Sequence, residues 1–223
     1  MKLVKHIRRR SVIIVILFTV FLYGAYHALS LRAFFLLASI TIRGDGAIPS
    51  LISALDDEAE IVRGVTTSRL PQFGSEAIRP LIQTLNERDP LRREGAAICL
   101  GRMAIMRPEV APVLRIEATL PLRQLMFDDS DSRVKVQAAL ALWRINGVAE
   151  DVVPALVSFS AKSHDIRVRE TALRAFEEMG ASATEATAVL LDCVDDPDPL
   201  IQTWSKTALR AVNPIEANRR RIP

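Results

Sequence analysis

The chain lacks the sequence patterns on which most enzyme sites are built. Its 223 residues contain no G-x-S-x-G nucleophile motif and no phosphate loop of the G-x-x-x-x-G-K type. The two cysteines, Cys99 and Cys193, are too few for a disulfide framework, form no C-x-x-C pair and have no histidine suited to nucleophilic catalysis. These absences predict that the protein is not an enzyme, and we expect both cysteines to be small buried side chains.

Metal ligands are equally scarce. The chain has three histidines, His6, His27 and His164. The acidic turn at residues 128–131 invites comparison with a calcium loop, which needs glycine at its sixth position and glutamate at its twelfth. Counting from Asp129, those positions hold Val134 and Leu140. We therefore expect no metal and no cofactor, and we interpret the acidic turns as helix caps in contact with solvent.

The net charge of +3 hides an uneven distribution of charged residues. Residues 1–30 hold five basic residues and no acid, which leaves 24 Lys and Arg against 26 Asp and Glu in the rest of the chain. Non-specific nucleic-acid binding depends on Lys and Arg that neutralise phosphates. Because the body of the protein is mildly acidic, its composition disfavours a nucleic-acid partner.

Residues 11–30 form an apolar stretch, SVIIVILFTVFLYGAYHALS, without a formally charged residue. About 20 such residues span the hydrocarbon core of a bilayer, and the basic residues that precede them predict a cytoplasmic N-terminus. We expect an uncleaved, single-pass transmembrane signal anchor that holds the rest of the chain outside the cytoplasm. The alternative is a signal peptide cleaved near Ala28, which would leave a secreted or periplasmic protein.

The body of the chain contains one motif five times. An acidic turn is followed by an apolar residue, a long polar residue and, three positions later, a small residue. Repetition at a period of about 20–50 residues is typical of stacked-repeat proteins. The long polar and small residues of the five units are Arg63 and Thr66, Arg92 and Gly95, Lys135 and Ala138, Arg169 and Ala172, and Gln202 and Ser205.

Each unit is predicted to contain two helices, because apolar residues recur at intervals of three and four. Prolines near the start of four first helices, and Gly74, Gly147 and Gly180 after three second helices, mark their ends. The turn acids precede the long polar residues by three or four positions, so we expect them to favour the helix N-termini and to pair with the basic residues. The first helices are predicted at 47–55, 77–85, 120–127, 152–159 and 186–194, and the second at 61–73, 91–103, 133–146, 166–179 and 199–212.

Three segments carry the motif most clearly: DPLRREGAAICLGRM (89–103), DSRVKVQAALALWRING (131–147) and DIRVRETALRAFEEMG (165–180). They resemble the HEAT-repeat family, in particular the short repeats of the phycobilisome lyases. The resemblance covers residues 47–212 and implies an all-α fold, a right-handed α-solenoid of about five HEAT-like helix pairs preceded by one transmembrane helix. One branch of HEAT-like enzymes carries an iron site with repeated His-Glu pairs, which this chain lacks because none of its histidines precedes a glutamate.

The predicted organisation has five parts. Residues 1–10 form a basic cytoplasmic N-terminus, 11–30 the signal anchor, 31–46 a juxtamembrane or capping segment, 47–212 the repeat domain and 213–223 a basic tail. The apolar residues 31–42 have three possible placements: an extension of the membrane helix, the membrane interface, or a cap on the first repeat, which we favour. About ten extra residues fall within 104–117, between units two and three, and are expected to form a loop on one face.

Stacked repeats use extended concave faces for binding. We expect the second helices to form such a face and to bind a protein partner, as a scaffold or accessory subunit of a membrane or envelope complex. Two alternatives stay open: a role like that of the phycobilisome lyases, acting on a chromophore-bearing partner, and a HEAT-like nucleic-acid binder. The candidate interaction residues are Arg93, Glu94, Gln137, Arg144, Glu170, Arg174, Lys206 and Arg210.

Overall fold

The computed structural model describes residues 44–162 and 165–222, and these residues form helices and turns without a strand. The predicted anchor at 11–30, the apolar segment 31–42 and all three histidines lie outside the described residues. Within the described part of the chain, no helix is both long and apolar enough to cross a membrane. The membrane anchor therefore stays a prediction from the sequence.

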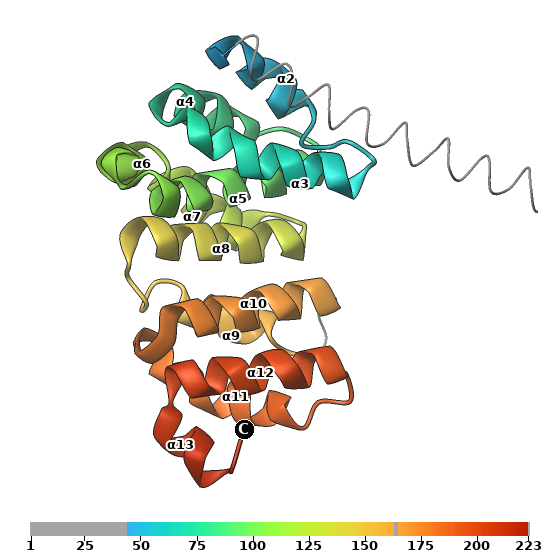
Figure 1. The fold of residues 1–223 in the computed structure, drawn as a ribbon, viewed down its shortest axis with the longest axis vertical. Helices are drawn as coiled ribbons and strands as arrows, with labels where there is room; N and C mark the ends of the chain where they lie inside the picture. Colours follow the sequence, from blue (N-terminus) through green and yellow to red (C-terminus); the bar gives the residue numbers. More distant parts are fainter. Residues whose placement is uncertain (1–43, 163–164, 223) are drawn as a thin grey trace, which may run out of the picture.

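Five helix pairs stack along the chain (Figure 1). The first helices are α2 (Ile48–Ser53), α4 (Ser75–Thr84), α7 (Thr119–Asp128), α9 (Val153–Phe159) and α11 (Thr187–Val194). The second helices are α3 (Glu60–Arg69), α5 (Pro90–Met106), α8 (Ser132–Asn146), α10 (Ile166–Met179) and α12 (Pro199–Val212). Short 3₁₀ segments link them: η1 (Gly44–Ala47), η2 (Leu70–Phe73), η3 (Pro108–Val110) and η4 (Gly180–Ala186).

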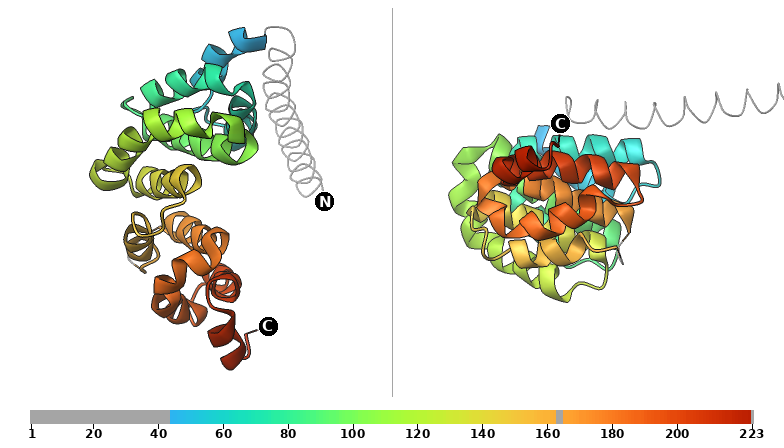
Figure 2. Two further views of the ribbon diagram at one scale, coloured as in Figure 1. Left: turned by 90° about the vertical axis from the view of Figure 1, so that its left-hand side faces the viewer. Right: turned by 90° about the horizontal axis from the view of Figure 1, so that it is seen from below.

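The second helices pack on one another in chain order: α3 on α5, α5 on α8, α8 on α10 and α10 on α12. Figure 2 shows that the stack bends, with the second helices on its concave side and the first helices on its convex side. The helical-pair architecture predicted from the sequence is thus present, and its concave side is formed by the predicted helices.

The small residue of the motif lies in the packed core. Thr66, Ala138, Ala172 and Ser205 are completely buried, and Gly95 is buried against Leu55. A Cβ atom at Gly95 would lie 2.8 Å from Leu55 Cδ2. A small residue at this position therefore permits close contact between helices.

The acidic turn residues cap the second helices. Side-chain oxygens of Asp89, Asp131, Asp165 and Asp198 accept hydrogen bonds from main-chain N–H groups two residues later, at 2.7–2.8 Å. Such caps satisfy N–H groups that have no partner inside the helix. The predicted role at the helix N-termini is confirmed.

The long polar residues bond the main chain and do not pair with the capping acids as expected. Lys135 Nζ donates to the carbonyl of Phe127 at 2.9 Å, and Arg169 Nε donates to that of Ser160 at 3.0 Å. Gln202 Nε2 donates to the carbonyl of Asp196 at 2.7 Å. The capping carboxylates already accept from N–H groups, so the longer side chains reach the carbonyls at the end of the preceding helix or turn. This shared donor role explains why glutamine can replace a basic residue in unit five.

Three local predictions need correction. The insertion within 104–117 is helical: α5 continues to Met106, and η3 and α6 (Ala111–Glu117) follow. The expected basic tail contains α13 (Pro214–Arg219), which packs on α12 and buries Ala217. Helix α4 begins at Ser75, so Pro80 lies inside it and not in its first turn.

Candidate protein-interaction groove

Two depressions lie on the concave side of the solenoid, and together we call them the inner groove. One, of about 400 Å³, is bounded by α5, α8 and α10, and the other, of about 190 Å³, by α3 and α5 with the starts of α8 and α10. Ile98 lines both, so the two depressions adjoin each other. Their lining residues that carry charge are Glu60, Arg63, Glu94, Arg102, Arg133, Arg144, Arg167, Arg174, Glu177 and Glu178.

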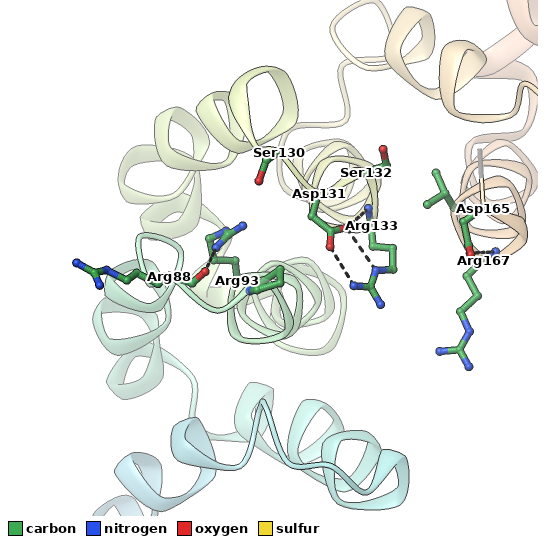
Figure 3. Close-up of a pocket in the computed structure, with 10 residues that line it drawn as sticks. Arg88, Arg93, Ser130, Asp131, Ser132, Arg133, Asp165 and Arg167 are labelled. Atoms are coloured by element: carbon green, nitrogen blue, oxygen red, sulfur yellow. Dashed lines mark hydrogen bonds and ion pairs between the residues drawn. The ribbon is translucent and has the colours of Figure 1, made fainter. Parts of the chain in front are cut away.

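A third depression, of about 640 Å³, lies at the starts of α5, α8 and α10 (Figure 3). Arg133 and Arg167 line both this turn-edge pocket and the inner groove. In Figure 3 their side chains extend in the same direction from the starts of α8 and α10. One lined surface therefore crosses four successive second helices, from α3 to α10.

Four of the eight predicted interaction residues line the inner groove: Glu94, Gln137, Arg144 and Arg174. Arg93 lines the turn-edge pocket. The other three lie on α10 and α12 but line none of these depressions: Glu170, Lys206 and Arg210. The structure thus brings half of the predicted set together and places the rest beside it.

Arg93 connects two repeat units. Its Nε and Nη2 donate to the two carboxylate oxygens of Asp129 at 2.7 and 2.9 Å, and its Nη1 donates to the carbonyls of Glu87 and Arg88. The bidentate bond to Asp129 raises the pKa of Arg93 further above its ordinary value. Every nitrogen of the guanidinium group is used, so we assign Arg93 to the framework and not to recognition.

Arg144 and Glu178 bridge α8 and α10 along the groove. Arg144 Nη2 lies 2.7 Å from Glu178, and Arg144 Nε donates to the same carboxylate at 2.9 Å. Both side chains are partly exposed, so the pair adds little to stability. Its geometric effect is to fix the position of both groups at one end of the groove.

Three other arginines of the groove retain free donors. Arg102 donates one hydrogen bond, from Nη1 to Thr67 Oγ1 at 3.2 Å. The Arg174 guanidinium lies over the Trp204 ring, 5.3 Å from its centroid, and its Nη1 forms an ion pair with Glu170 at 3.8 Å, beyond hydrogen-bond distance. Within the described part of the chain, the exposed side chain of Arg167 has no hydrogen-bond partner.

Glu94 is a half-buried carboxylate that lines the same groove as these arginines. Burial raises its pKa, while the positive charges of Arg133, Arg63 and Arg167 act in the opposite direction. Because burial outweighs the arginines, its charge is only partly compensated. Glu94 therefore places a negative charge in an arginine-rich part of the groove, and its effect on binding can be tested directly.

Sequence reasoning missed Arg133 and Arg167. Arg133 lies two positions before Lys135, and Arg167 lies two positions before Arg169. Because the two arginines hold the same position in neighbouring units, the repeat pattern could have indicated that they lie side by side. Both arginines lie in the first turn of their helix, where the sequence pattern does not show which face of the helix they occupy. Within residues 44–162 and 165–222, no cluster of three or more His, Cys, Asp and Glu could hold a metal ion.

Residues 119–210 match the family model of HEAT repeats. An engineered protein shares the fold at 21% identity and a TM-score of 0.53, over 82% of this chain and 84% of its own. A designed armadillo repeat protein in complex with the peptide (KR)4 does so at 22% identity and a TM-score of 0.52, over 85% and 92%. A mutant of Kap121p matches at 17% identity and a TM-score of 0.58, over 82% of this chain and 21% of Kap121p. No curated protein matches the chain.

The match to HEAT repeats lies between α7 and α12, and the described chain shares its fold with helical repeat solenoids. This fold is a scaffold suited to protein–protein interaction. The likeness to the phycobilisome-lyase type stays a prediction from the sequence.

Proposed function

We propose that the protein is a membrane-anchored HEAT-repeat adaptor that binds a segment of a partner protein in the inner groove. The observation that carries the proposal is that two adjoining depressions are lined by residues of four successive second helices. A rigid stack of helices presents this surface without rearrangement, which lowers the entropy cost of binding.

The described structure gives the groove a composition suited to a peptide chain. Apolar and polar uncharged residues, including Ile98, Gln137, Leu140 and Thr171, lie between the charged ones. The designed armadillo repeat protein is in complex with the peptide (KR)4, which supports the use of this fold for binding a peptide segment. The anchor predicted at 11–30 would hold the groove outside the cytoplasm, within a membrane or envelope complex, and would raise its concentration near partners in that membrane.

Site-specific photo-crosslinking in intact cells tests the proposal. A benzophenone side chain placed at Gln137, in the groove, should crosslink one dominant protein, whereas the same group at Gln124, exposed on α7, should not. Deleting residues 1–30 should abolish the adduct if the anchor positions the groove. Equal adducts at both positions, or none at Gln137, would contradict the groove as the binding surface.

A further inference from the structure

We infer that the inner groove is built for an extended, acidic segment of the partner protein, in which carboxylate side chains alternate with apolar ones. The inference rests on the proposed function and adds the chemistry of the partner. Three separate observations support it: the charge of the groove, the spacing of its arginines and the residues that form its floor.

The groove is cationic on an acidic body. It contains six arginines against four glutamates, whereas residues 31–223 together hold 24 basic against 26 acidic residues. Of the six, Arg102 and Arg167 have guanidinium donors without a hydrogen-bond partner among the described residues, and Arg174 has only the 3.8 Å ion pair with Glu170. A guanidinium group with free edges is suited to a carboxylate, which it binds through two parallel hydrogen bonds.

The arginines come from successive helices, so their spacing follows that of the helices. Packed helix axes lie about 8–10 Å apart, and an extended chain rises about 3.3 Å per residue. The distance between side chains two or three residues apart in an extended peptide is thus similar to the distance between arginines on neighbouring helices. Four helices, α3 to α10, correspond to a segment of about eight to ten residues.

The floor of the groove is mixed and not uniformly basic. Ile98 and Leu140 lie between the arginines and suit apolar side chains of a peptide. Glu60, Glu94 and Glu177 are interspersed with the arginines. A nucleic-acid strand, which carries a phosphate at every nucleotide, would bring phosphates against these glutamates. A peptide can place its acids and its apolar residues selectively, so a protein segment fits the pattern better.

Fluorescence anisotropy with the full-length chain in detergent micelles tests this inference. The probe is a labelled peptide of about 12 residues that alternates glutamate with valine, and its matched control has lysine in place of every glutamate. We expect the glutamate peptide to bind and the lysine peptide not to bind. Raising the salt concentration should weaken binding, because screening reduces interactions between exposed charges.

Groove variants locate the site. Replacing Arg102 and Arg167 together by Gln should weaken binding of the glutamate peptide about tenfold or more. The control, Arg79→Gln, removes an exposed arginine from α4, outside the groove, and should leave binding unchanged. The single variant Arg167→Glu gives an independent reading, because that exposed side chain makes no hydrogen bond within the described fold and its replacement should not unfold the protein.

Several results would overturn the inference. These are tighter binding of the lysine peptide, tighter binding of a single-stranded oligonucleotide than of the glutamate peptide, equal loss in the Arg79→Gln control, and no binding of any peptide. The crosslinking at Gln137 separates this failure from that of the proposed function. If the crosslinked partner segment is neutral or basic, the acidic preference is wrong and the adaptor function stands.

Discussion

Two arginines on α10, only two positions apart, show how differently the two sides of a second helix are used. Arg169 faces the packed side, where Nη2 lies 2.6 Å from Asp196 and Nε donates to the carbonyl of Ser160 at 3.0 Å. Arg167 faces the inner groove, and its exposed side chain has no hydrogen-bond partner within the described residues. The donors on the first side are satisfied within the fold, whereas those of Arg167 on the second side have no hydrogen-bond partner among the described residues.

The comparison separates framework from recognition by position in the repeat. Lys135, Arg169 and Gln202 occupy the recurring long polar position, and each donates to a main-chain carbonyl near the preceding turn. Arg102 and Arg167 lie outside that position and line the groove, whereas Arg63 of unit one holds the recurring position and also lines the groove. In a repeat protein, residues common to all units describe the scaffold, so specificity has to come from residues that vary.

The strongest test of this contrast removes each arginine in turn. Arg169→Met leaves Asp196, which is completely buried, without its ion-pair partner, and should lower the free energy of unfolding by about 3–5 kcal/mol. Arg167→Met should change it by about 0.5 kcal/mol or less, because that side chain is exposed. Urea denaturation followed by circular dichroism measures both. Similar losses of unfolding free energy in the two variants would mean that Arg169 and Arg167 do not differ in their contribution to the fold.

Acid titration tests the same pair through its carboxylate. The hydrogen bond from Arg169 holds the pKa of Asp196 below its usual value. A carboxylate with a lowered pKa in the folded state stabilises the protein above its unfolded pKa of about 3.9, and this contribution is lost as pH falls through the folded pKa. The loss of stability below about pH 4 should therefore be shallower in the double variant Arg169→Met/Asp196→Asn than in the parent. Identical acid slopes would contradict it.

The spacing of α5 and α8 beneath the groove gives a third test. At Gly101, a Cβ atom would lie 2.9 Å from the Cα atom of Ala141, so α5 and α8 would have to separate. We expect Gly101→Ala to destabilise the fold by about 1–3 kcal/mol.

Gly64→Ala on α3 is its matched control. A Cβ atom at Gly64 meets nothing within 4 Å, so alanine should stabilise the helix by up to about 1 kcal/mol. Thermal unfolding compares the two variants, and a neutral Gly101→Ala would mean that the helices are not in close contact there.

The sequence predicted the helices well because their end signals are local. The predicted ranges 166–179 and 199–212 are those of α10 and α12, whose starts are capped by Asp165 and Asp198. The insertion, which contains Pro108 and Pro112, was misread because extra residues in a regular repeat array often form a loop. Each proline instead begins a short helix, and Val110 and Leu114 are buried. Burial by neighbouring units is a tertiary effect that the local pattern does not contain.

The groove was only half predictable for a related reason. Helical periodicity identifies which residues of one helix share a face, and four of the predicted residues, Glu94, Gln137, Arg144 and Arg174, line the groove. The rotation of each helix about its axis relative to its neighbours decides which residues converge. That rotation depends on packing contacts such as Gly101 with Ala141, and it brings Arg133 and Arg167 into the groove.

Glu94→Gln is the mildest change and opposes the effect of the arginine variants. Because burial raises the pKa of Glu94, its ionisation destabilises the fold as pH rises above the unfolded value of about 4.3. Glutamine should therefore be neutral or stabilising by about 0.5 kcal/mol near pH 7, with the difference vanishing below pH 4. It should also tighten binding of the glutamate peptide, since it removes a negative charge beside Arg133 and Arg167. Weaker binding with unchanged stability would instead mean that Glu94 itself contacts the partner and that the groove selects a cation at this point.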